Sequence, residues 1–158
     1  MAIEKVIDYF TSLGAADKIR QFDVSSATVE LAAQALGCEG ARIAKTMSFL
    51  VDGRAVLIVC AGDVKVNSSK FKATFHVKAK MLTAEQLVEL VGHAPGGVCP
   101  FAVNEGCETY LDESLKRFAV VYPAAGDAAS AVELTIPELE RYSGCTAWVD
   151  VCKPKEQQ

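Results

Sequence analysis

The sequence predicts an α+β fold built on a mixed, strongly curved β-sheet, and three observations favour this class. Strand-like and helix-like segments are interspersed, without the steady alternation of a doubly wound sheet. No internal repeat is visible. The length of 158 residues, of which 51% are hydrophobic, allows one sizeable core and is too short for two ordinary domains. We therefore expect a single domain over residues 1–158.

The N-terminal part is predicted to be helical. Apolar residues recur at helical spacing over residues 3–13, and Gly14 stands where a left-handed cap would end that helix. A second helix is expected to end at Gly37, with Ser25 or Ser26 as its N-cap. These two helices precede the strand-rich part of the chain.

A β-hairpin is predicted after the helices. Residues 46–51 and 55–60 have the composition of strands, and the Asp-Gly dipeptide at 52–53 favours a tight turn between them. Residues 41–45 are expected to add only a short turn before the first strand.

Shorter elements are predicted downstream. Residues 67–72 indicate a capped, lysine-bearing helix, and residues 77–81 indicate a strand. Thr83 and Gln86 make a capping box for a helix over residues 84–91. The remaining predictions are strands at 108–111, 118–122, 131–136 and 146–151, a short helix at 137–142 and a frayed tail at 153–158.

The charge distribution separates one basic segment from an acidic remainder. The net charge is −4, but residues 41–80 contain eight Lys or Arg and two Asp, a net of +6, which leaves −10 for the rest. This asymmetry favours local contact with the phosphate backbone at the end of a nucleic acid. The alternative is a solvated lysine face without a partner.

Cysteine usage and hydropathy exclude several classes of protein. The six cysteines show no CxxC spacing and only two histidines accompany them, so we expect reduced thiols and no metal site. No apolar run approaches the roughly 20 residues of a membrane helix, and residues 1–5 lack the features of a secretory signal. We expect a cytoplasmic protein with no membrane partner.

Two motifs carry candidate chemistry. In the loop at 96–101, Gly-Gly-Val-Cys-Pro-Phe, the glycines let backbone amides approach a ligand, while Pro95 and Pro100 restrict the chain. Amides from Gly96 to Cys99 can hydrogen-bond an oxyanion, and Lys45 can hold a phosphate. The alternatives are a tight turn made for folding and an exposed lysine at a helix end.

A nucleophile with a histidine base is the rival arrangement. The chain offers only His76 and His93, and His93 lies close in sequence to Cys99. The alternatives are a solvent-facing or capping His93 and a small, buried, hydrophobic Cys99. Paired carboxylates and a phosphate-loop motif are absent from the sequence.

Several segments, taken in order, resemble the YbaK family of aminoacyl-tRNA editing domains over roughly residues 26–152. They are Thr-Val-Glu-Leu-Ala-Ala at 28–33, Ile-Ala-Lys-Thr at 43–46, Ala-Gly-Asp at 61–63, Lys-Phe-Lys at 70–72, the loop at 96–101 and Tyr-Leu-Asp-Glu-Ser-Leu at 110–115. The resemblance implies a mixed barrel of six or seven strands with helices packed outside. It implies neither a metal nor an organic cofactor.

The resemblance also implies an activity. Members hydrolyse a wrongly attached small amino acid, chiefly alanine or cysteine on the proline tRNA, as free-standing proteins or as a domain of prolyl-tRNA synthetase. The implied partners are the acceptor end of tRNA and prolyl-tRNA synthetase. The expected catalytic residues are Lys45, Gly96, Gly97, Val98 and Cys99; the expected substrate-binding residues are Thr46, Lys70, Lys72, His93, Pro100, Phe101 and Asp112.

Two departures from the family pattern concern specificity. Cys99 stands where many members have serine, and Ala102 stands where glycine is common, so the size of the amino-acid pocket is left open. Two other functions remain alternatives to a free-standing deacylase. One is a non-catalytic module that binds an acceptor end or a synthetase, and the other is a thiol-dependent hydrolase or redox protein using Cys99. The sequence also leaves the oligomeric state open.

Overall fold

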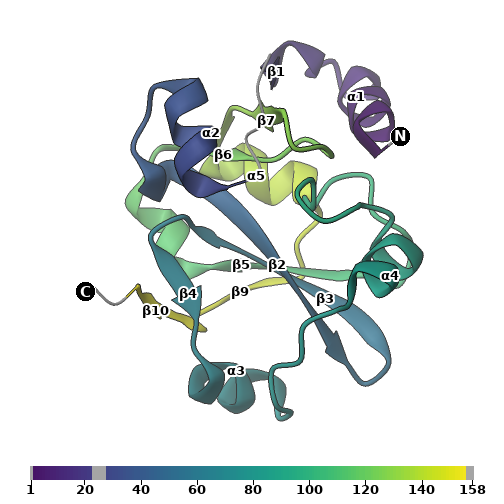
Figure 1. The fold of residues 1–158 in the computed structure, drawn as a ribbon, viewed down its shortest axis with the longest axis vertical. Helices are drawn as coiled ribbons and strands as arrows, with labels where there is room; N and C mark the ends of the chain where they lie inside the picture. Colours follow the sequence, from purple (N-terminus) through teal and green to yellow (C-terminus); the bar gives the residue numbers. More distant parts are fainter. Residues whose placement is uncertain (1, 23–27, 156–158) are drawn as a thin grey trace.

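The computed structural model describes residues 2–22 and 28–155, which form an α+β fold around one curled, mixed sheet with helices outside it (Figure 1). The six strands of this sheet within the described residues have the order β8-β6-β2-β3-β5-β9. Their bounds are β2 Ile43–Val51, β3 Arg54–Ala61, β5 Glu108–Asp112, β6 Val120–Pro123, β8 Leu134–Thr135 and β9 Ala147–Val149. The predicted fold class and curved mixed sheet are confirmed.

The β2–β3 hairpin forms the centre of the sheet. Its turn at 52–53 has φ angles of 51° and 80°, both left-handed, as a tight type I′ turn requires. The antiparallel register places Lys45 directly opposite Cys60. The hairpin prediction is confirmed, but β2 begins two residues before Lys45, so the expected turn at 41–45 is reduced to the 3-10 turn Gly40–Arg42.

β6 and β9 are shorter than the sequence pattern suggests, and one further predicted run is divided because the chain changes partners. The predictions at 108–111, 118–122 and 146–151 correspond to β5, β6 and β9. The run at 131–136 is divided between β7 (Ser130–Val132), which pairs with β1 (Ile19–Gln21), and β8, which pairs with β6. The expectation of one continuous strand there is wrong.

Residues 77–81 do not form the predicted strand. Met81 makes a single bridge to Phe49 of β2, and Leu50 N–H donates to the Lys80 carbonyl at 2.8 Å. The segment then leaves the sheet because Thr83 caps the next helix, α4 (Ala84–Gln86).

The predicted frayed tail is wrong for the residues that the structure describes. Cys152–Pro154 form β10, which pairs antiparallel with β4 (Val64–Val66). Lys65 and Lys153 stand opposite each other in this pair of strands, which we call the β4–β10 ribbon. The last described residues are therefore held by main-chain hydrogen bonds.

The N-terminal helices form as predicted, with one change of cap. α1 (Ala2–Ser12) ends before Gly14, which has a φ of 71°. α2 (Val29–Leu36) is capped by Thr28, whose Oγ1 accepts from the Leu31 N–H at 3.1 Å. The serines at 25–26, which the sequence suggested as caps, lie outside the described residues.

The later helices also agree with their cap signals. α3 (Ser68–Phe75) is capped by Asn67 and is longer than predicted. The capping box of Thr83 and Gln86 is confirmed, but after α4 the backbone widens into the π-helical segment Leu87–Val91. α5 (Ile136–Ser143) has a proline in its first turn.

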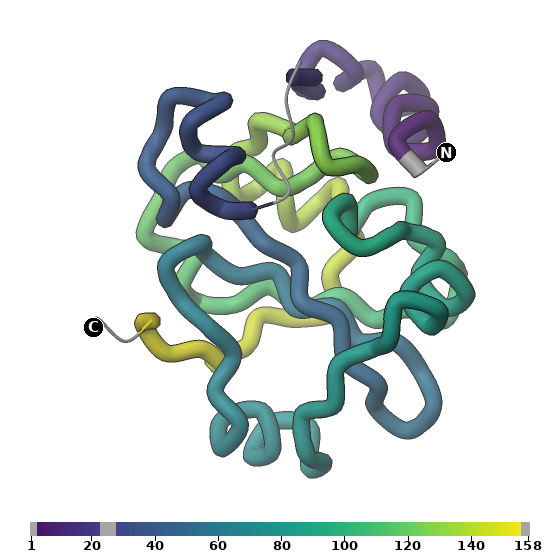
Figure 2. The backbone as a smooth tube through the Cα atoms, viewed as in Figure 1, coloured from purple at the N-terminus to yellow at the C-terminus, as the bar shows by residue number. Residues whose placement is uncertain are grey.

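β3 contributes a long buried run to the core, because all of its residues except the first are buried. α1 docks through Phe10, whose ring lies 4.9 Å from that of Phe101 in an edge-to-face contact. Figure 2 shows α1 and β10 on opposite sides of the molecule. Among the described helices, none has the length and hydropathy needed to cross a membrane.

Candidate active site

A pocket of about 290 Å³ lies between β2, α2 and the loop before Pro100. Lys45 and Thr46 of β2 line it together with Gly96 and Val98 of the loop, so the two motifs face one cavity. The other lining residues are Thr28, Val29, Ala32, Ile43, Ala44, Met47, Tyr122, Ala124, Ser130 and Ala131.

The pocket lies at a gap in the edge of β2. The first two residues of β2 pair with β6, and further along Ser48 and Leu50 bond to residues 80–82. Main-chain groups of alternate residues point to the same edge of a strand. The N–H and C=O of Thr46 therefore point into the gap, where no strand of the described chain pairs with them.

The hydroxyl of Thr46 is also unpaired. Its Oγ1 is buried and has no hydrogen-bond partner among the described residues. An unpaired buried hydroxyl costs about 1–3 kcal/mol. A bound molecule with a polar group at this point would remove that cost.

Lys45 places a half-buried cation in the pocket. Burial lowers the pKa of its ammonium group because the charged form loses hydration, and repulsion from the Lys155 ammonium lowers this pKa further. Within the described part of the chain, no carboxylate forms an ion pair with Lys45. The position therefore favours an anionic ligand such as a phosphate.

The glycine-rich loop is a packed wall of this pocket. Gly96 has a φ of 89°, which only glycine adopts readily. A Cβ on Gly97 would lie 2.6 Å from the Asp127 Cα, so this glycine permits close packing of two loops and does not open space for a ligand. The Gly97 N–H donates to the Ala94 carbonyl at 3.1 Å.

The remaining amides of the loop are the available donors. Among the described residues, the N–H groups of Gly96, Val98 and Cys99 have no hydrogen-bond partner. Gly97 is thus removed from the expected set of oxyanion donors because its amide is already used. Of the other three residues, Gly96 and Val98 line the pocket and Cys99 does not.

His93 and Cys99 form a buried pair outside the pocket lining. The His93 Nε2 lies 2.8 Å from the Phe101 carbonyl and 3.5 Å from the Cys99 Sγ. Burial lowers the pKa of His93 and raises that of the Cys99 thiol to about 12. The expectation of a solvent-facing or capping His93 is wrong, because its side chain is only 1% exposed. Pro100 and Phe101 are buried beside this pair.

Three other expected substrate-binding residues also lie outside the pocket lining. Buried Asp112 accepts hydrogen bonds from the N–H groups of Ser114 and Val151, both at 2.9 Å. Lys70 pairs with Asp150 at 2.9 Å. Lys72 lines a separate hollow beside α3. The structure therefore brings Lys45, Thr46, Gly96 and Val98 together and leaves these three apart.

Sequence reasoning missed the α2 side of the pocket. Val29 and Ala32 line it from one helix face, and their apolar spacing was the signal that could have suggested a lining role. Lys155 was also missed, because nothing in a short terminal segment indicates that it folds back beside Lys45.

A comparison with protein families identifies the class. The model described as "Aminoacyl-tRNA editing domain" matches residues 23–142. This range contains both motifs of the pocket. The chain therefore belongs to the aminoacyl-tRNA editing domain family.

Individual relatives agree with this membership. "Uncharacterized protein YwhH" of Bacillus subtilis (strain 168) is 45% identical over 157 residues, covering 99% of this chain and 100% of the relative. The "Proline--tRNA ligase" of the same organism is 34% identical over 83 residues, covering 52% of this chain but only 14% of the ligase. A crystal structure of a proposed trans-editing enzyme for prolyl tRNA synthetase has a TM-score of 0.87 at 27% identity, covering 96% of this chain and 97% of that one.

Proposed function

We propose that this protein is a free-standing aminoacyl-tRNA deacylase that acts in trans on mischarged tRNA, removing a small amino acid such as alanine or cysteine from the proline tRNA. The observation that carries the proposal is that Lys45 and the loop residues Gly96 and Val98 line one pocket. Family membership supports the class of reaction. The end-to-end match to a Bacillus subtilis protein supports action outside a synthetase chain.

Lys45 is proposed to hold the phosphate of the terminal adenosine. Its ammonium group is poorly hydrated and repelled by Lys155, so a bound phosphate would stabilise the charged form. This interaction positions the ester and does not require Lys45 to transfer a proton.

The loop amides are proposed to stabilise the tetrahedral intermediate. Water attacks the ester carbonyl and loses a proton, and the carbonyl oxygen becomes an oxyanion. When this intermediate collapses, the bond to the ribose oxygen breaks and that oxygen takes up a proton to become the free hydroxyl. Free N–H groups at Gly96 and Val98, which both line the pocket, are the candidate donors. Loss of one such donor in other enzymes costs on the order of 100- to 1,000-fold in rate. The vicinal ribose hydroxyl can orient the water, so no protein nucleophile is needed.

Substrate selection is proposed to depend on the walls of the pocket. Thr46 offers an unpaired carbonyl that can accept from the α-ammonium group of the amino acid. Val29 and Ala32 give the cavity apolar, close walls. A small cavity rejects larger groups by size, so correctly charged prolyl-tRNA is expected to be spared.

Deacylation assays test this proposal directly. The purified protein should release the amino acid from alanyl- or cysteinyl-tRNA-Pro and leave prolyl-tRNA-Pro intact. Salt-dependent binding of these tRNAs without turnover would instead indicate the non-catalytic binding module. Comparable hydrolysis of prolyl-tRNA-Pro would contradict selection by size.

A further inference from the structure

Six exposed lysines extend from the pocket along one side of the molecule. Residues 64–83 contain five Lys and no Asp or Glu, and β10 and the residue after it add two more Lys. One of these seven, Lys70, is neutralised by Asp150. We call the other six the lysine strip: Lys65, Lys72, Lys78, Lys80, Lys153 and Lys155.

The lysine strip carries largely unpaired charge, although the Lys155 ammonium lies close enough to Asp63 to add to the effect of Arg117, which lowers the pKa of that carboxyl. Lys65 and Lys153 are direct neighbours across the β4–β10 ribbon, an arrangement of like charges that weakens strand pairing. Among the described residues, no member of the strip has an ion-pair partner. Such a concentration of positive charge lowers local stability unless a partner uses it.

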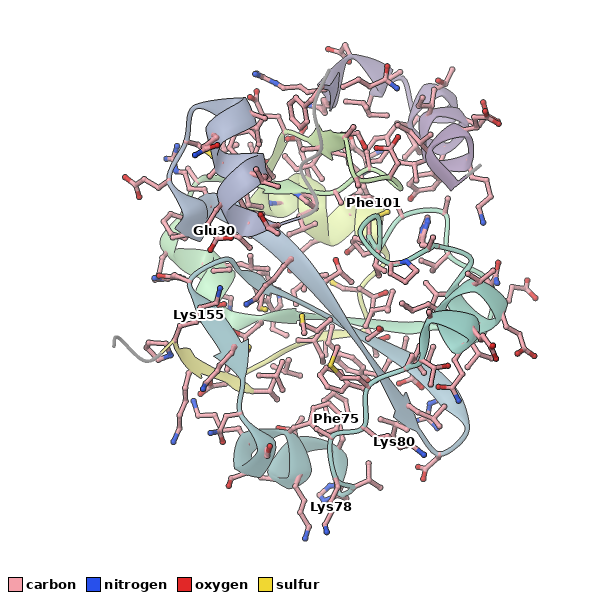
Figure 3. The ribbon with its side chains drawn as sticks, viewed as in Figure 1. Glu30, Phe75, Lys78, Lys80, Phe101 and Lys155 are labelled. Carbon is pink, nitrogen blue, oxygen red and sulfur yellow. The ribbon has the colours of Figure 1, made fainter. Side chains whose placement is uncertain are left out.

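The strip is continuous with the pocket. Lys155 extends the ribbon, because its N–H donates to the Asp63 carbonyl at 3.0 Å, and its ammonium group lies close enough to Lys45 to lower the pKa of that residue. Figure 3 shows Lys155 beside the ribbon and Lys78 at the far end, next to α3. At that end Lys72 and Lys78 line a hollow of about 300 Å³ with Ser68 and Ser69.

We propose that the lysine strip binds the phosphate backbone of the tRNA acceptor stem while its aminoacylated 3′ end occupies the pocket. This inference rests on the proposed function. The ribbon presents three paired residues at about 3.3 Å each, or roughly 10 Å of surface, before α3 continues it. Phosphates that follow the terminal one therefore meet Lys155 first, then Lys65 and Lys153, and then the lysines near α3.

An RNA backbone fits this surface better than an acidic protein face. The contacts are long, exposed ammonium groups, which suits sequence-independent phosphate binding by counterion release. The rest of the chain has a strongly acidic balance that repels RNA elsewhere. The strip thus fixes which side of the protein the stem approaches.

The test compares two double variants with the same change in net charge. The first, Lys65→Gln with Lys153→Gln, removes the opposed pair of the ribbon. The control, Lys5→Gln with Arg141→Gln, removes two cations outside the strip, on α1 and α5. Binding of uncharged tRNA-Pro is measured between 50 and 200 mM salt for wild type and both variants.

The ribbon variant should reduce the slope of log Kd against log salt by about 1–2, while the control keeps the wild-type slope. In deacylation, it should raise KM about tenfold with kcat unchanged. The ribbon variant should bind an acceptor-stem hairpin more weakly than the wild type does. Its affinity for a CCA trinucleotide should equal that of the wild type. Equal slopes and KM values for the two double variants would overturn the inference.

The same data separate the two proposals. Wild-type turnover with a ribbon variant that behaves like the control would disprove only the docking surface. Salt-dependent binding that the ribbon variant weakens, without any wild-type turnover, would disprove only the deacylase. If the wild type shows no turnover and the ribbon variant also behaves like the control, both proposals are disproved.

Discussion

Gly97 and Asp127 pack backbone to backbone, with the position of a Gly97 Cβ only 2.6 Å from the Asp127 Cα. Asp127 in turn accepts hydrogen bonds from the Ala129 N–H at 2.9 Å and the Ser130 hydroxyl at 2.7 Å. Because Ser130 lines the pocket, this contact joins the glycine-rich loop to the opposite wall. The shape of the cavity therefore depends on two loops that are distant in the sequence.

Gly97→Ala should separate these loops. The added methyl group has to displace backbone, so we expect a loss of about 1–3 kcal/mol in the free energy of unfolding and a lower kcat/KM for alanyl-tRNA-Pro. Urea denaturation and deacylation measure the two effects. Gly40→Ala is the matched control, because its Cβ would meet only the Val29 Cγ1 at 3.4 Å. Equal stability of the two variants would contradict the packing argument.

Lys45→Met should remove the phosphate contact while keeping the apolar stem. We expect deacylation to fall about 100-fold or more, and stability at neutral pH to be equal or higher because a desolvated charge is gone. The folded-state pKa of Lys45 is lowered from 10.5, so the unfolded chain binds more protons and wild-type stability rises as pH approaches 10.5. Denaturation at several pH values should show a weaker rise in the variant. Retained activity would remove Lys45 from the mechanism.

The Thr46→Val variant distinguishes a structural role of the Thr46 hydroxyl from a role in substrate binding. The Thr46 hydroxyl has no partner among the described residues, so an isosteric methyl group should leave the free energy of unfolding unchanged or raise it by about 1–3 kcal/mol. If the hydroxyl contacts the substrate, KM for alanyl-tRNA-Pro should rise about tenfold. A clear loss of stability would mean that the hydroxyl already has a structural role.

Cys99→Ser tests the thiol-dependent alternative. Burial raises the pKa of Cys99 to about 12, so the thiol is neutral at physiological pH and a poor nucleophile. We expect the variant to keep most of its deacylase activity and the wild-type pH–rate profile. A thiol reagent should label Cys99 only after unfolding. Loss of activity in a folded variant would favour the thiol mechanism.

His93→Gln should change the acid stability of the protein. Burial lowers the folded-state pKa of His93 below 6.5, so its neutral form is favoured in the fold and stability is lost as pH falls from 6.5 through that lower value. Glutamine can donate to the Phe101 carbonyl and does not titrate. Thermal unfolding between pH 7.5 and 5 should therefore show a smaller loss of Tm in the variant. Identical losses of Tm in the variant and the wild type would mean that other residues cause the acid sensitivity.

Local signals in the sequence predicted local structure well. The Asp-Gly turn fixed the β2–β3 hairpin, and the capping box at Thr83 fixed the start of α4, because each depends on a few neighbouring residues. Strand lengths after residue 107 were less predictable. Whether Val132 and Leu134 continue one strand depends on partners at β1 and β6, which the local pattern does not contain.

The features of the candidate site are likewise of two kinds: those that a local motif predicts and those that arise only from tertiary contacts. Lys45 and Gly96 were identified from motifs, and the structure brings them to one pocket. The role of Gly97 in loop packing and the gap beside Thr46 arise from tertiary contacts, so no sequence pattern indicates them. His93 was misjudged because a polar residue near prolines usually faces solvent, whereas here the Phe101 carbonyl satisfies one of its nitrogens within the core.

The neighbour that tunes Lys45 comes from beyond the editing-domain match, which ends at residue 142. Burial is the main cause of the lowered pKa of Lys45, and Lys155, which adds to it, belongs to the segment that follows the match. A chimera that exchanges only this last segment between relatives would alter the proton affinity of the lysine and leave the cavity walls intact. The segment after residue 142 therefore contributes a charge that acts on the pocket lysine, although none of its described residues lines the pocket.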